Sequence, residues 1–303
     1  MTQKRYLIVI GGPTAIGKTS VAIRVANYFG IEIISADSRQ FYQEMNIGTA
    51  KPTAAELAQA PHHFINNLSI KDSYSVGDYE REVLEKLAVL LEGYEAAILT
   101  GGSGLFIRAI CEGLDKFPAV PDGIRERLTA QLETEGIEQL QVALKQQDPL
   151  YYAEVDINNP HRLIRALSVI EASGQPFSTF RNQAPKERPF EIVPILLEMD
   201  RVELYERINR RVDIMMEEGL EAEARKLHPQ RHLNALQTVG YEELFKYFEG
   251  ELSLEEAVEL IKRNSRRYAK RQMTWFRKKP HWQRFDAKDV DGLLAFLRER
   301  LMT

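Results

Sequence analysis

Residues 12–19 read Gly12-Pro13-Thr14-Ala15-Ile16-Gly17-Lys18-Thr19 and match the pattern G-x-x-x-x-G-K-[ST]. The apolar segment 6–10 precedes them, and segment 20–26 follows with helix-forming residues. A strand, a glycine-bounded loop and a helix form the context in which this pattern binds phosphate. Glycines let several backbone N–H groups point at one anion, and the helix N-terminus adds unpaired donors and partial positive charge. Lys18 adds a full charge and Thr19 a hydroxyl suited to Mg²⁺, so the sequence predicts a polyphosphate site.

The composition is that of an ordinary globular protein: 303 residues, of which 44% are hydrophobic and 28% charged. This length allows two domains or one domain with an insertion. The single cysteine, Cys111, excludes an internal disulfide, suits a reducing compartment and is interpreted as a core residue. No apolar segment has membrane-spanning length, and the short one after Arg5 is interpreted as a first strand and not as a signal peptide. With a formal net charge of −4, any nucleic-acid surface must be local.

Polar residues follow the second predicted strand, 32–34, and read Ser35-Ala36-Asp37-Ser38-Arg39-Gln40. The carboxyl edge of an open α/β sheet is where ligands bind, and the phosphate loop lies at the same edge. Asp37 therefore has three possible roles, between which the spacing does not decide. It lies beside the phosphates, or it caps a helix beginning near Ser38, or it holds a metal ion as in nucleotide hydrolases.

Two further segments have both a functional and a structural interpretation. Lys51, in Gly48-Thr49-Ala50-Lys51-Pro52, reaches a phosphate or is simply solvated. The loop Thr100-Gly101-Gly102-Ser103-Gly104 follows the predicted strand 96–99 at the same sheet edge. We favour substrate contact for this loop over close backbone packing. The histidine pairs 62/63 and 228/232 lack the spacing and the further ligands of a metal site.

From about residue 114 to 188 the strands stop, and helices are predicted over 122–134, 137–146 and 160–173. Asn159 is a candidate N-cap for the last of these helices. Arg162 and Arg165 share a face there, as in an RNA-binding or an ordinary surface helix. We predict a helical insertion, 114–188, in a core formed by 1–113 and 189–303.

The rest of the core is predicted to hold a strand at 191–197, placed at an edge or bulge because of Pro194. Helices are predicted over 53–60, 77–92, 201–216 and 254–277, and from 105 and 219; a last strand, 282–285, and a helix, 289–301, complete the core. Segment 262–279 contains nine Lys or Arg, no Asp or Glu, and interleaved aromatic residues. An exposed helix face normally mixes charges of both signs, so this basic block favours an anionic macromolecule over simple solvation.

Together these segments closely resemble the tRNA dimethylallyltransferase, or tRNA isopentenyltransferase, family. The resemblance rests on the phosphate loop and on segments 35–42, 47–52, 101–106, 159–167, 239–241 and 270–277, which occur in the family's order. Ser103 departs from the family's usual threonine but keeps the hydroxyl, and the chain lacks the C-terminal zinc finger of eukaryotic relatives, as bacterial forms do. The implied fold is α/β, with a P-loop NTPase-like parallel sheet core and a helical insertion domain.

The resemblance implies transfer of a dimethylallyl group from dimethylallyl diphosphate to N6 of the adenosine 3′ of a tRNA anticodon. Asp37 would be the general base, and residues 12–19 with Arg211 would hold diphosphate, with Mg²⁺ on Thr19. The P-loop also suggests the nucleotide- or ATP-binding description common for such motifs. The implied partners are tRNA and dimethylallyl diphosphate, without a membrane, in a cytoplasmic monomer. The residues that match tRNA-contacting positions are Asp37, Ser38, Arg39, Gln40, Ser103, Arg125, His161, Arg162, Leu163, Ile164, Arg165, Gln237, Thr238, Val239, Gly240, Tyr241, Glu242, Lys270, Arg271, Gln272, Trp275 and Arg277.

Three other functions remain to be compared with this one. A small-molecule kinase explains the phosphate loop but leaves the basic aromatic helix unexplained. A prenyltransferase acting on free adenine nucleotides needs no large basic surface. An RNA-binding module without catalysis needs no phosphate loop.

Overall fold

The computed structural model describes residues 4–181 and 184–301. It divides into two compact units, one formed by Met1–Glu112 with Glu187–Thr303 and the other by Gly113–Lys186. The predicted boundaries of the insertion, 114 and 188, lie within two residues of this division. The two units are described separately.

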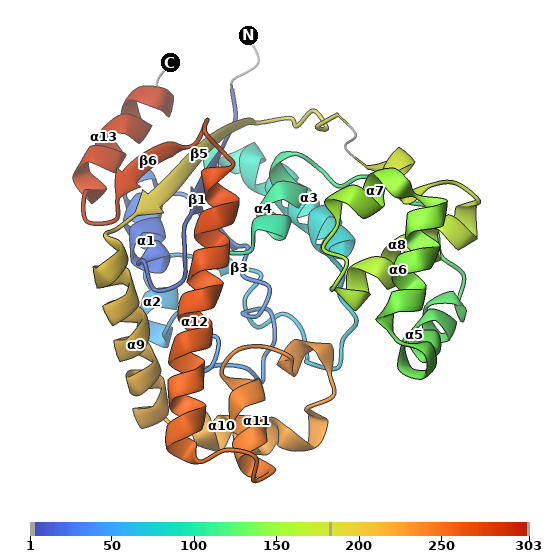
Figure 1. Cartoon of the computed structure of the whole chain (residues 1–303). Coiled ribbons are helices and arrows are strands. Elements are labelled where there is room, and N and C mark those ends of the chain that lie inside the picture. The colour runs from blue at the N-terminus through green and yellow to red at the C-terminus, as the bar shows by residue number, and fades with distance from the viewer. Residues whose placement is uncertain (1–3, 182–183, 302–303) are drawn as a thin grey trace. The chain divides into compact units, whose positions relative to one another are not determined.

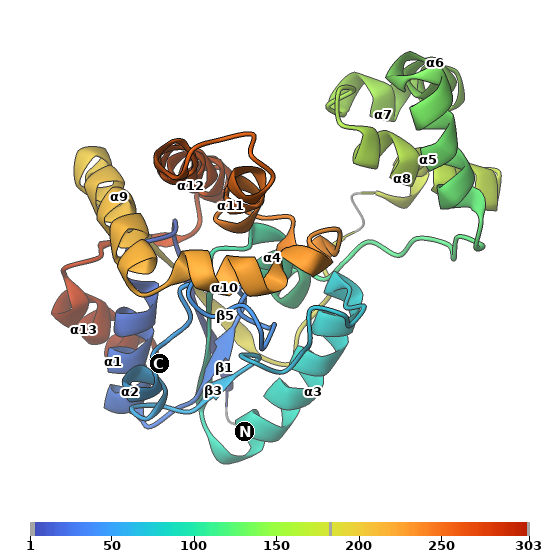
Figure 2. The ribbon, with the colours of Figure 1, turned by 90° about the horizontal axis from the view of Figure 1, so that it is seen from below.

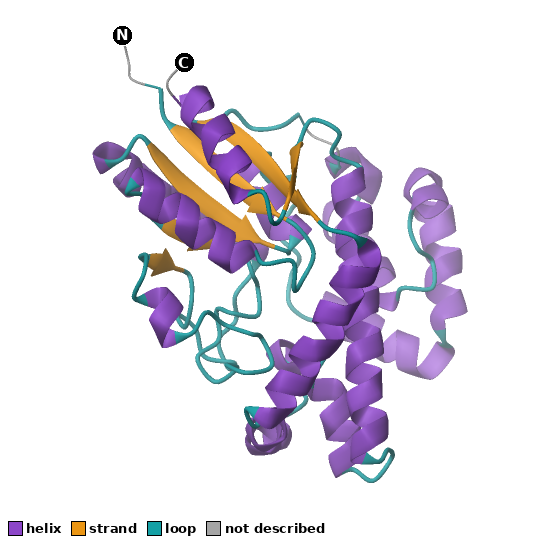
Figure 3. Ribbon diagram, turned by 90° about the vertical axis from the view of Figure 1, so that its left-hand side faces the viewer, coloured by secondary structure: helices purple, strands orange, loops and turns teal. Residues whose placement is uncertain are grey.

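The first unit is built on a six-stranded parallel sheet in the order β3-β2-β4-β1-β5-β6. The strands are β1 (Tyr6–Gly11), β2 (Ile33–Ser35), β3 (His62–His63), β4 (Ala96–Gly101), β5 (Glu191–Glu198) and β6 (Gln283–Asp286). The α/β prediction is confirmed, and Figure 3 shows helices on both faces of the sheet. Since β1 lies between β4 and β5, the loops that follow β2, β4, β1 and β5 meet at one edge.

Alternating residues of β1 enter two separate cores, because successive side chains of a strand point to opposite faces. Ile8 and Ile10 pack on one face with α1 (Lys18–Phe29) and α13 (Val290–Leu301). Leu7 and Val9 pack on the other face with α3 (Val76–Gly93) and α4 (Gly104–Cys111). The sheet is thus buried on both sides, as its continuous apolar strands require.

The prediction that Pro194 marks an edge strand is wrong. β5 lies inside the sheet, with Pro194 opposite Val9 of β1. However, β6 pairs only with the segment Ile195–Glu198 of β5. Pro194 therefore lies where β5 has one neighbour, and proline is tolerated there because no second ladder needs its N–H.

A third core lies under the helices α9 (Arg201–Glu217), α10 (Leu220–Leu227), α11 (Tyr241–Phe248) and α12 (Leu254–Arg277). Figures 1 and 2 show these helices together at one end of the first unit, with α9 beside α12. A capping box opens α12, where Ser253 Oγ accepts from Glu256 N. α12 is the longest helix, yet none within the described residues has both the length and the apolar character to cross a membrane.

The second unit is a small helical bundle, α5 (Ile124–Glu135), α6 (Ile137–Gln147), α7 (Pro149–Glu154) and α8 (Pro160–Ser173). The predicted cap of α8 is confirmed, since Asn159 Oδ1 accepts from Arg162 N at 3.3 Å. Helix α7 was not predicted because Asp148-Pro149 has the composition of a turn. Instead, Asp148 caps the helix through Tyr151 N and also binds Ser178 N, at 3.0 and 2.7 Å.

Candidate active site

The phosphate loop leaves the N-terminus of α1 open to an anion. Gly17 is the N-cap with φ +103°, a left-handed conformation that suits glycine, and no side chain caps the helix. The first N–H groups of α1 therefore have no side-chain acceptor, and the helix contributes partial positive charge at this point. The predicted arrangement of strand, loop and helix is confirmed.

Lys18 bonds back to its own loop. Its Nζ donates to Gly12 O at 3.0 Å and to Pro13 O at 2.8 Å. Burial lowers the pKa of Lys18 to about 8, an effect partly offset by the charge of Asp37 and reinforced by Arg211. A half-buried cation held only by neutral carbonyls favours an anionic ligand.

Asp37 lies directly after β2, with its backbone fixed on both sides. Its Oδ1 accepts from Arg39 N at 3.1 Å, and its N donates to Ser35 Oγ at 3.3 Å. Gln40 N donates to Asp37 O at 3.1 Å, so residues 37–40 form a turn and no helix begins near Ser38. Of the three roles considered for Asp37, the helix cap is therefore excluded.

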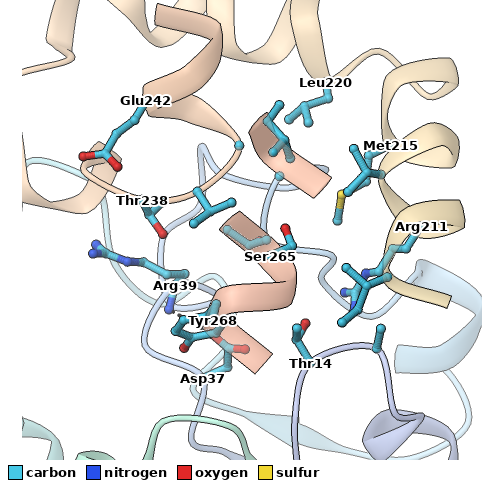
Figure 4. Close-up of a pocket in the computed structure, with 18 of the residues that line it drawn as sticks. Thr14, Asp37, Arg39, Arg211, Met215, Leu220, Thr238, Glu242, Ser265 and Tyr268 are labelled. Atoms are coloured by element: carbon cyan, nitrogen blue, oxygen red, sulfur yellow. Dashed lines mark hydrogen bonds between the residues drawn. The ribbon is translucent and has the colours of Figure 1, made fainter. Parts of the chain in front are cut away.

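Two cavities meet at Asp37. The first, of about 700 Å³, is lined by the phosphate loop and by three arginines of α9, Arg207, Arg210 and Arg211. The second, of about 460 Å³, extends between α9, α10 and α12 and has an apolar end lined by Ile208, Val212, Met215, Leu220, Val239 and Ile261. Figure 4 shows Asp37 and Tyr268 on one side of this second cavity and Met215 and Leu220 on the opposite side. Both cavities share Thr14, Ala15, Asp37, Thr49, Arg211 and Tyr268, so a cationic space adjoins an apolar one.

Arg211 lies in the shared wall, where its Nη2 donates to Ala50 O at 3.3 Å. Burial lowers the pKa of Arg211, while Asp37 raises it. An arginine remains charged under such conditions. Its predicted place beside the phosphate loop agrees with the structure. The neighbouring Arg207 and Arg210 were visible in the sequence but were not assigned to the site.

Several residues that match tRNA-contacting positions instead bind the protein's own backbone. Arg39 donates to the carbonyls of Asn234, Ala235 and Gln237 at 2.9 to 3.2 Å. Gln40 Nε2 donates to Thr49 O and Ala50 O at 3.3 and 3.2 Å. Other residues that match tRNA-contacting positions lie together around the second cavity: Ser38, Gln237, Thr238, Val239, Gly240 and Glu242.

Three of these matches fall on buried side chains. Tyr241 and Leu163 are fully buried, the first in the core under α10–α12 and the second in the helical insertion. Gln272 is 7% exposed, and its side chain joins Thr14 N, at 2.8 Å, to Gly102 O, at 3.0 Å. These side chains are therefore not available for direct contact with RNA in this structure.

The loop after β4 packs closely against its neighbours, and the substrate contact favoured from the sequence stays a prediction. A Cβ on Gly101 would lie 2.5 Å from Ala36 O, and one on Gly104 would lie 2.5 Å from the ring of Trp275. Trp275 is thus partly covered by this loop. Ser103 keeps a polar position, with its Oγ 3.4 Å from Ser38 Oγ.

The basic block on α12 is largely unpaired. Lys262 pairs with Asp213, Arg266 donates to Asn209 Oδ1 and Lys279 pairs with Glu112. The six other cations are exposed and have no acidic partner among the described residues: Arg263, Arg267, Lys270, Arg271, Arg277 and Lys278. An unpaired positive surface of this kind suits a polyanion.

The insertion presents a second, separate set of basic residues. Arg125, His161, Arg162 and Arg165 are exposed, and Arg165 lies over the ring of Phe117 at 5.2 Å. Ile164 is half-buried and packs against the insertion's core. Contact of the exposed residues Arg125, His161, Arg162 and Arg165 with tRNA stays a prediction.

Metal-ligating and nucleophilic side chains give no further site. In segments 4–181 and 184–301, no group of three His, Cys, Asp or Glu is placed to hold a metal ion. His63 pairs with Glu32 at 2.5 Å. Lys51 is half-buried and donates to Asn46 Oδ1 and Asn66 Oδ1, so it is not simply solvated, and it lines the phosphate-loop cavity, where contact with a phosphate stays a prediction. Burial raises the pKa of Cys111 to about 12, as expected of a core thiol.

Comparison with known proteins identifies relatives over the whole chain. The IPP transferase family model matches residues 40–279. The tRNA dimethylallyltransferase of Christiangramia forsetii is 56% identical over 99% of this chain and 100% of its own length. The tRNA dimethylallyltransferase 1 of Bacteroides fragilis is 47% identical over 98% of this chain and 99% of its own.

Two solved structures share this architecture. A full-length tRNA isopentenylpyrophosphate transferase from Bacillus halodurans has 38% identity and a TM-score of 0.74, covering 99% of this chain and 97% of that one. A eukaryotic dimethylallyltransferase acting on tRNA has 25% identity and a TM-score of 0.80, covering 95% of this chain and 75% of that one. These neighbours agree with the P-loop NTPase-like core described above.

Proposed function

The chain belongs to the IPP transferase family and is a tRNA dimethylallyltransferase, and we propose that it transfers the dimethylallyl group of dimethylallyl diphosphate to an adenosine beside the anticodon. The acceptor atom in this proposal is the exocyclic N6 of the adenosine 3′ of the anticodon. We propose in addition that the enzyme is cytoplasmic and monomeric.

The observation that supports this substrate most is the junction of the two cavities at Asp37 and Arg211. Dimethylallyl diphosphate has a polyanionic head and a short branched apolar tail. The cationic cavity with the phosphate loop suits the head, and the apolar side chains of α9, α10 and α12 suit the tail. With both parts bound, the reacting carbon lies near the junction, beside the carboxylate of Asp37.

A Mg²⁺ ion fits the residues present. Mg²⁺ keeps several waters and is usually bound through one or two protein oxygens together with substrate phosphates, so a cluster of three acidic residues is not needed. The hydroxyl of Thr19 lines the phosphate-loop cavity and is the protein oxygen that would hold it. When bound, the ion would neutralise charge on the diphosphate.

The chain's own residues account for the remaining chemistry. The C1–O bond to diphosphate breaks, a bond from N6 to C1 forms, and the proton of the amine passes to the carboxylate of Asp37. Lys18, Arg211 and the N–H groups of α1 stabilise the negative charge of the departing diphosphate. The adenine amine is a weak nucleophile because its lone pair is delocalised, so its orientation at the junction matters as much as its deprotonation.

The unpaired basic surface argues against a kinase or a prenyltransferase of free nucleotides. Neither would need the six exposed cations of segment 262–279. The target base must leave its stack to reach the cavity, and arginines beside aromatic rings are suited to hold a splayed anticodon loop.

The test is nucleoside analysis of unmodified tRNA after incubation with the enzyme, Mg²⁺ and dimethylallyl diphosphate. We expect a prenylated adenosine and release of diphosphate in equal amounts, and neither with Asp37→Asn. ATP in place of dimethylallyl diphosphate is the matched control. Turnover of ATP to ADP without prenylated adenosine would contradict the proposal and indicate a kinase.

A further inference from the structure

One wall shared by the two cavities is an irregular loop, residues 46–50, that follows the turn at Asp37. Thr49 lines both cavities, and the carbonyl of Ala50 accepts from Arg211 Nη2 at 3.3 Å. Gln40 Nε2 also donates to the carbonyls of both residues. The position of this loop therefore affects where the guanidinium of Arg211 lies.

The loop is held from behind by one carboxylate. Glu223 on α10 accepts from three consecutive backbone N–H groups: Oε2 from Asn46 at 3.0 Å and Ile47 at 2.9 Å, and Oε1 from Gly48 at 3.0 Å. Consecutive N–H groups that converge in this way form an anion-binding concavity, and here a side chain of the protein fills it. Hydrogen bonds to an ionised group are about twice as strong as neutral ones.

Tyr241 completes the arrangement. Its hydroxyl donates to Glu223 Oε1 at 2.7 Å, and its ring covers Gly48 so closely that a Cβ there would lie 2.6 Å from the ring. The ring is fully buried, and burial raises the pKa of Tyr241, so it remains a donor. This contact explains the glycine of segment 47–52, which the proposed chemistry does not use.

We propose that Glu223 is a positioning residue for prenyl transfer: its carboxylate fixes residues 46–50 and, through Ala50, places Arg211 at the diphosphate. Glu223 lines neither cavity, so it acts through the loop and not on the substrate. The inference rests on the proposed function, since it assumes that Arg211 meets the diphosphate of the prenyl donor.

The experiment compares Glu223→Gln with wild type and with Glu221→Gln. Glu221 is on the same helix, and within the described residues its carboxylate accepts a hydrogen bond from the exposed Arg225. For Glu223→Gln we expect KM for dimethylallyl diphosphate, and Kd for inorganic diphosphate by calorimetry, to rise about 10-fold, the size of losing a hydrogen bond to a charged group. KM for tRNA should change less than about 2-fold, because the basic surface of α12 is untouched.

The split between the two KM values separates positioning from a purely structural role. A merely structural glutamate would lower the melting temperature and leave both KM values of the folded enzyme unchanged, and that result would overturn the inference. If Glu223→Gln does not fold, Tyr241→Phe replaces it, with an expected rise in diphosphate Kd of about 3-fold. An unchanged Kd in Tyr241→Phe would then overturn the inference. Failure of the wild-type enzyme to bind diphosphate or to prenylate tRNA would instead contradict the proposed function.

Discussion

Replacing Gln272 by methionine tests whether this residue serves the phosphate loop or the tRNA. Its amide joins Thr14 N to Gly102 O, and it is buried on the face of α12 that also carries Ala269 and Phe276. Methionine keeps the volume and the helix propensity of glutamine, so the main change is the loss of both hydrogen bonds.

The expected loss of stability follows from the two backbone groups that lose their partner, the N–H of Thr14 and the carbonyl of Gly102. Gly102 is buried and Thr14 is partly exposed, so the carbonyl loses its partner without access to water, whereas the N–H is partly rehydrated. With about 1 to 3 kcal/mol for a buried unsatisfied group and less for the exposed one, the unfolding free energy should fall by about 2 to 4 kcal/mol. For a unit of this size, that lowers the melting temperature by roughly 4 to 16 °C.

The assay measures melting temperature, tRNA affinity and single-turnover prenyl transfer in Gln272→Met and in Lys270→Met. Lys270 is on the same helix and exposed, so its substitution should leave the melting temperature unchanged and weaken tRNA binding. Gln272→Met should do the reverse: transfer slows because Thr14 and its loop are no longer fixed, whereas tRNA affinity is kept. If Gln272→Met weakened tRNA binding at an unchanged melting temperature, direct RNA contact would be the correct role.

Four further predictions concern the reacting groups and the basic surface. Asp37→Asn should keep tRNA affinity but slow single-turnover transfer by about 100-fold or more, since an amide does not accept the proton; a wild-type rate would rule out Asp37 as the base. Affinity for an unreactive thiolo analogue of dimethylallyl diphosphate should fall above about pH 8 as the free Lys18 deprotonates, because its pKa is lowered to about 8 while the ligand, whose last ionisation lies at about pH 6, is already ionised there; Lys18→Ala should remove this dependence. The same lowered pKa means that the folded state holds fewer protons than the unfolded state between about pH 8 and 10.5, so the contribution of Lys18 to stability rises with pH across that window. Neutralising Arg267, Lys270 and Arg271 should lower the slope of log affinity against log salt by about 0.7 for each lost phosphate contact, and an unchanged slope would remove this surface from the tRNA site.

The sheet and the phosphate loop were predictable because both depend on local sequence. Apolar strands that end in glycine or polar residues determine the elements and place the loops at one edge. Helix α7 was missed although Asp148-Pro149 is an N-cap and proline pair like Asn159-Pro160. Only the structure shows that Asp148 also binds Ser178, thirty positions away in the sequence. The prediction from Pro194 was wrong for a similar reason. Only the pairing of β6, which begins at Ile195 of β5, shows that Pro194 has a single neighbouring strand.

The buried glutamine of α12 could have been recognised from helical periodicity. Ala269, Gln272 and Phe276 have spacings of three and four, the repeat of a buried stripe, while the lysines and arginines around them fall on other faces. Resemblance to a family assigns a motif as a whole. Burial then separates its members: in segment 270–277, Lys270, Arg271 and Arg277 are exposed and remain predicted RNA contacts, whereas Gln272 is buried.

The polar residues at the sheet edge provide hydrogen-bond partners for the backbone of the loops as well as groups for the reaction. Loops without regular structure leave N–H and C=O groups that must find partners if they are to hold one conformation. Arg39, Gln40, Glu223 and Gln272 supply these partners across 9 to 258 positions of sequence. Such a loop is fixed by distant side chains and not by its own turn chemistry, so no local pattern reveals which residue holds which loop. It follows that substituting most motif residues should change transfer through the order of the loops, whereas the charged residues Lys18, Asp37 and Arg211 of the phosphate-loop cavity should change it through the substrate. Affinity for inorganic diphosphate distinguishes the two kinds of effect, because chemical rescue by a small cation should restore binding in a variant of Arg211 and should fail in a variant whose loop has lost its position.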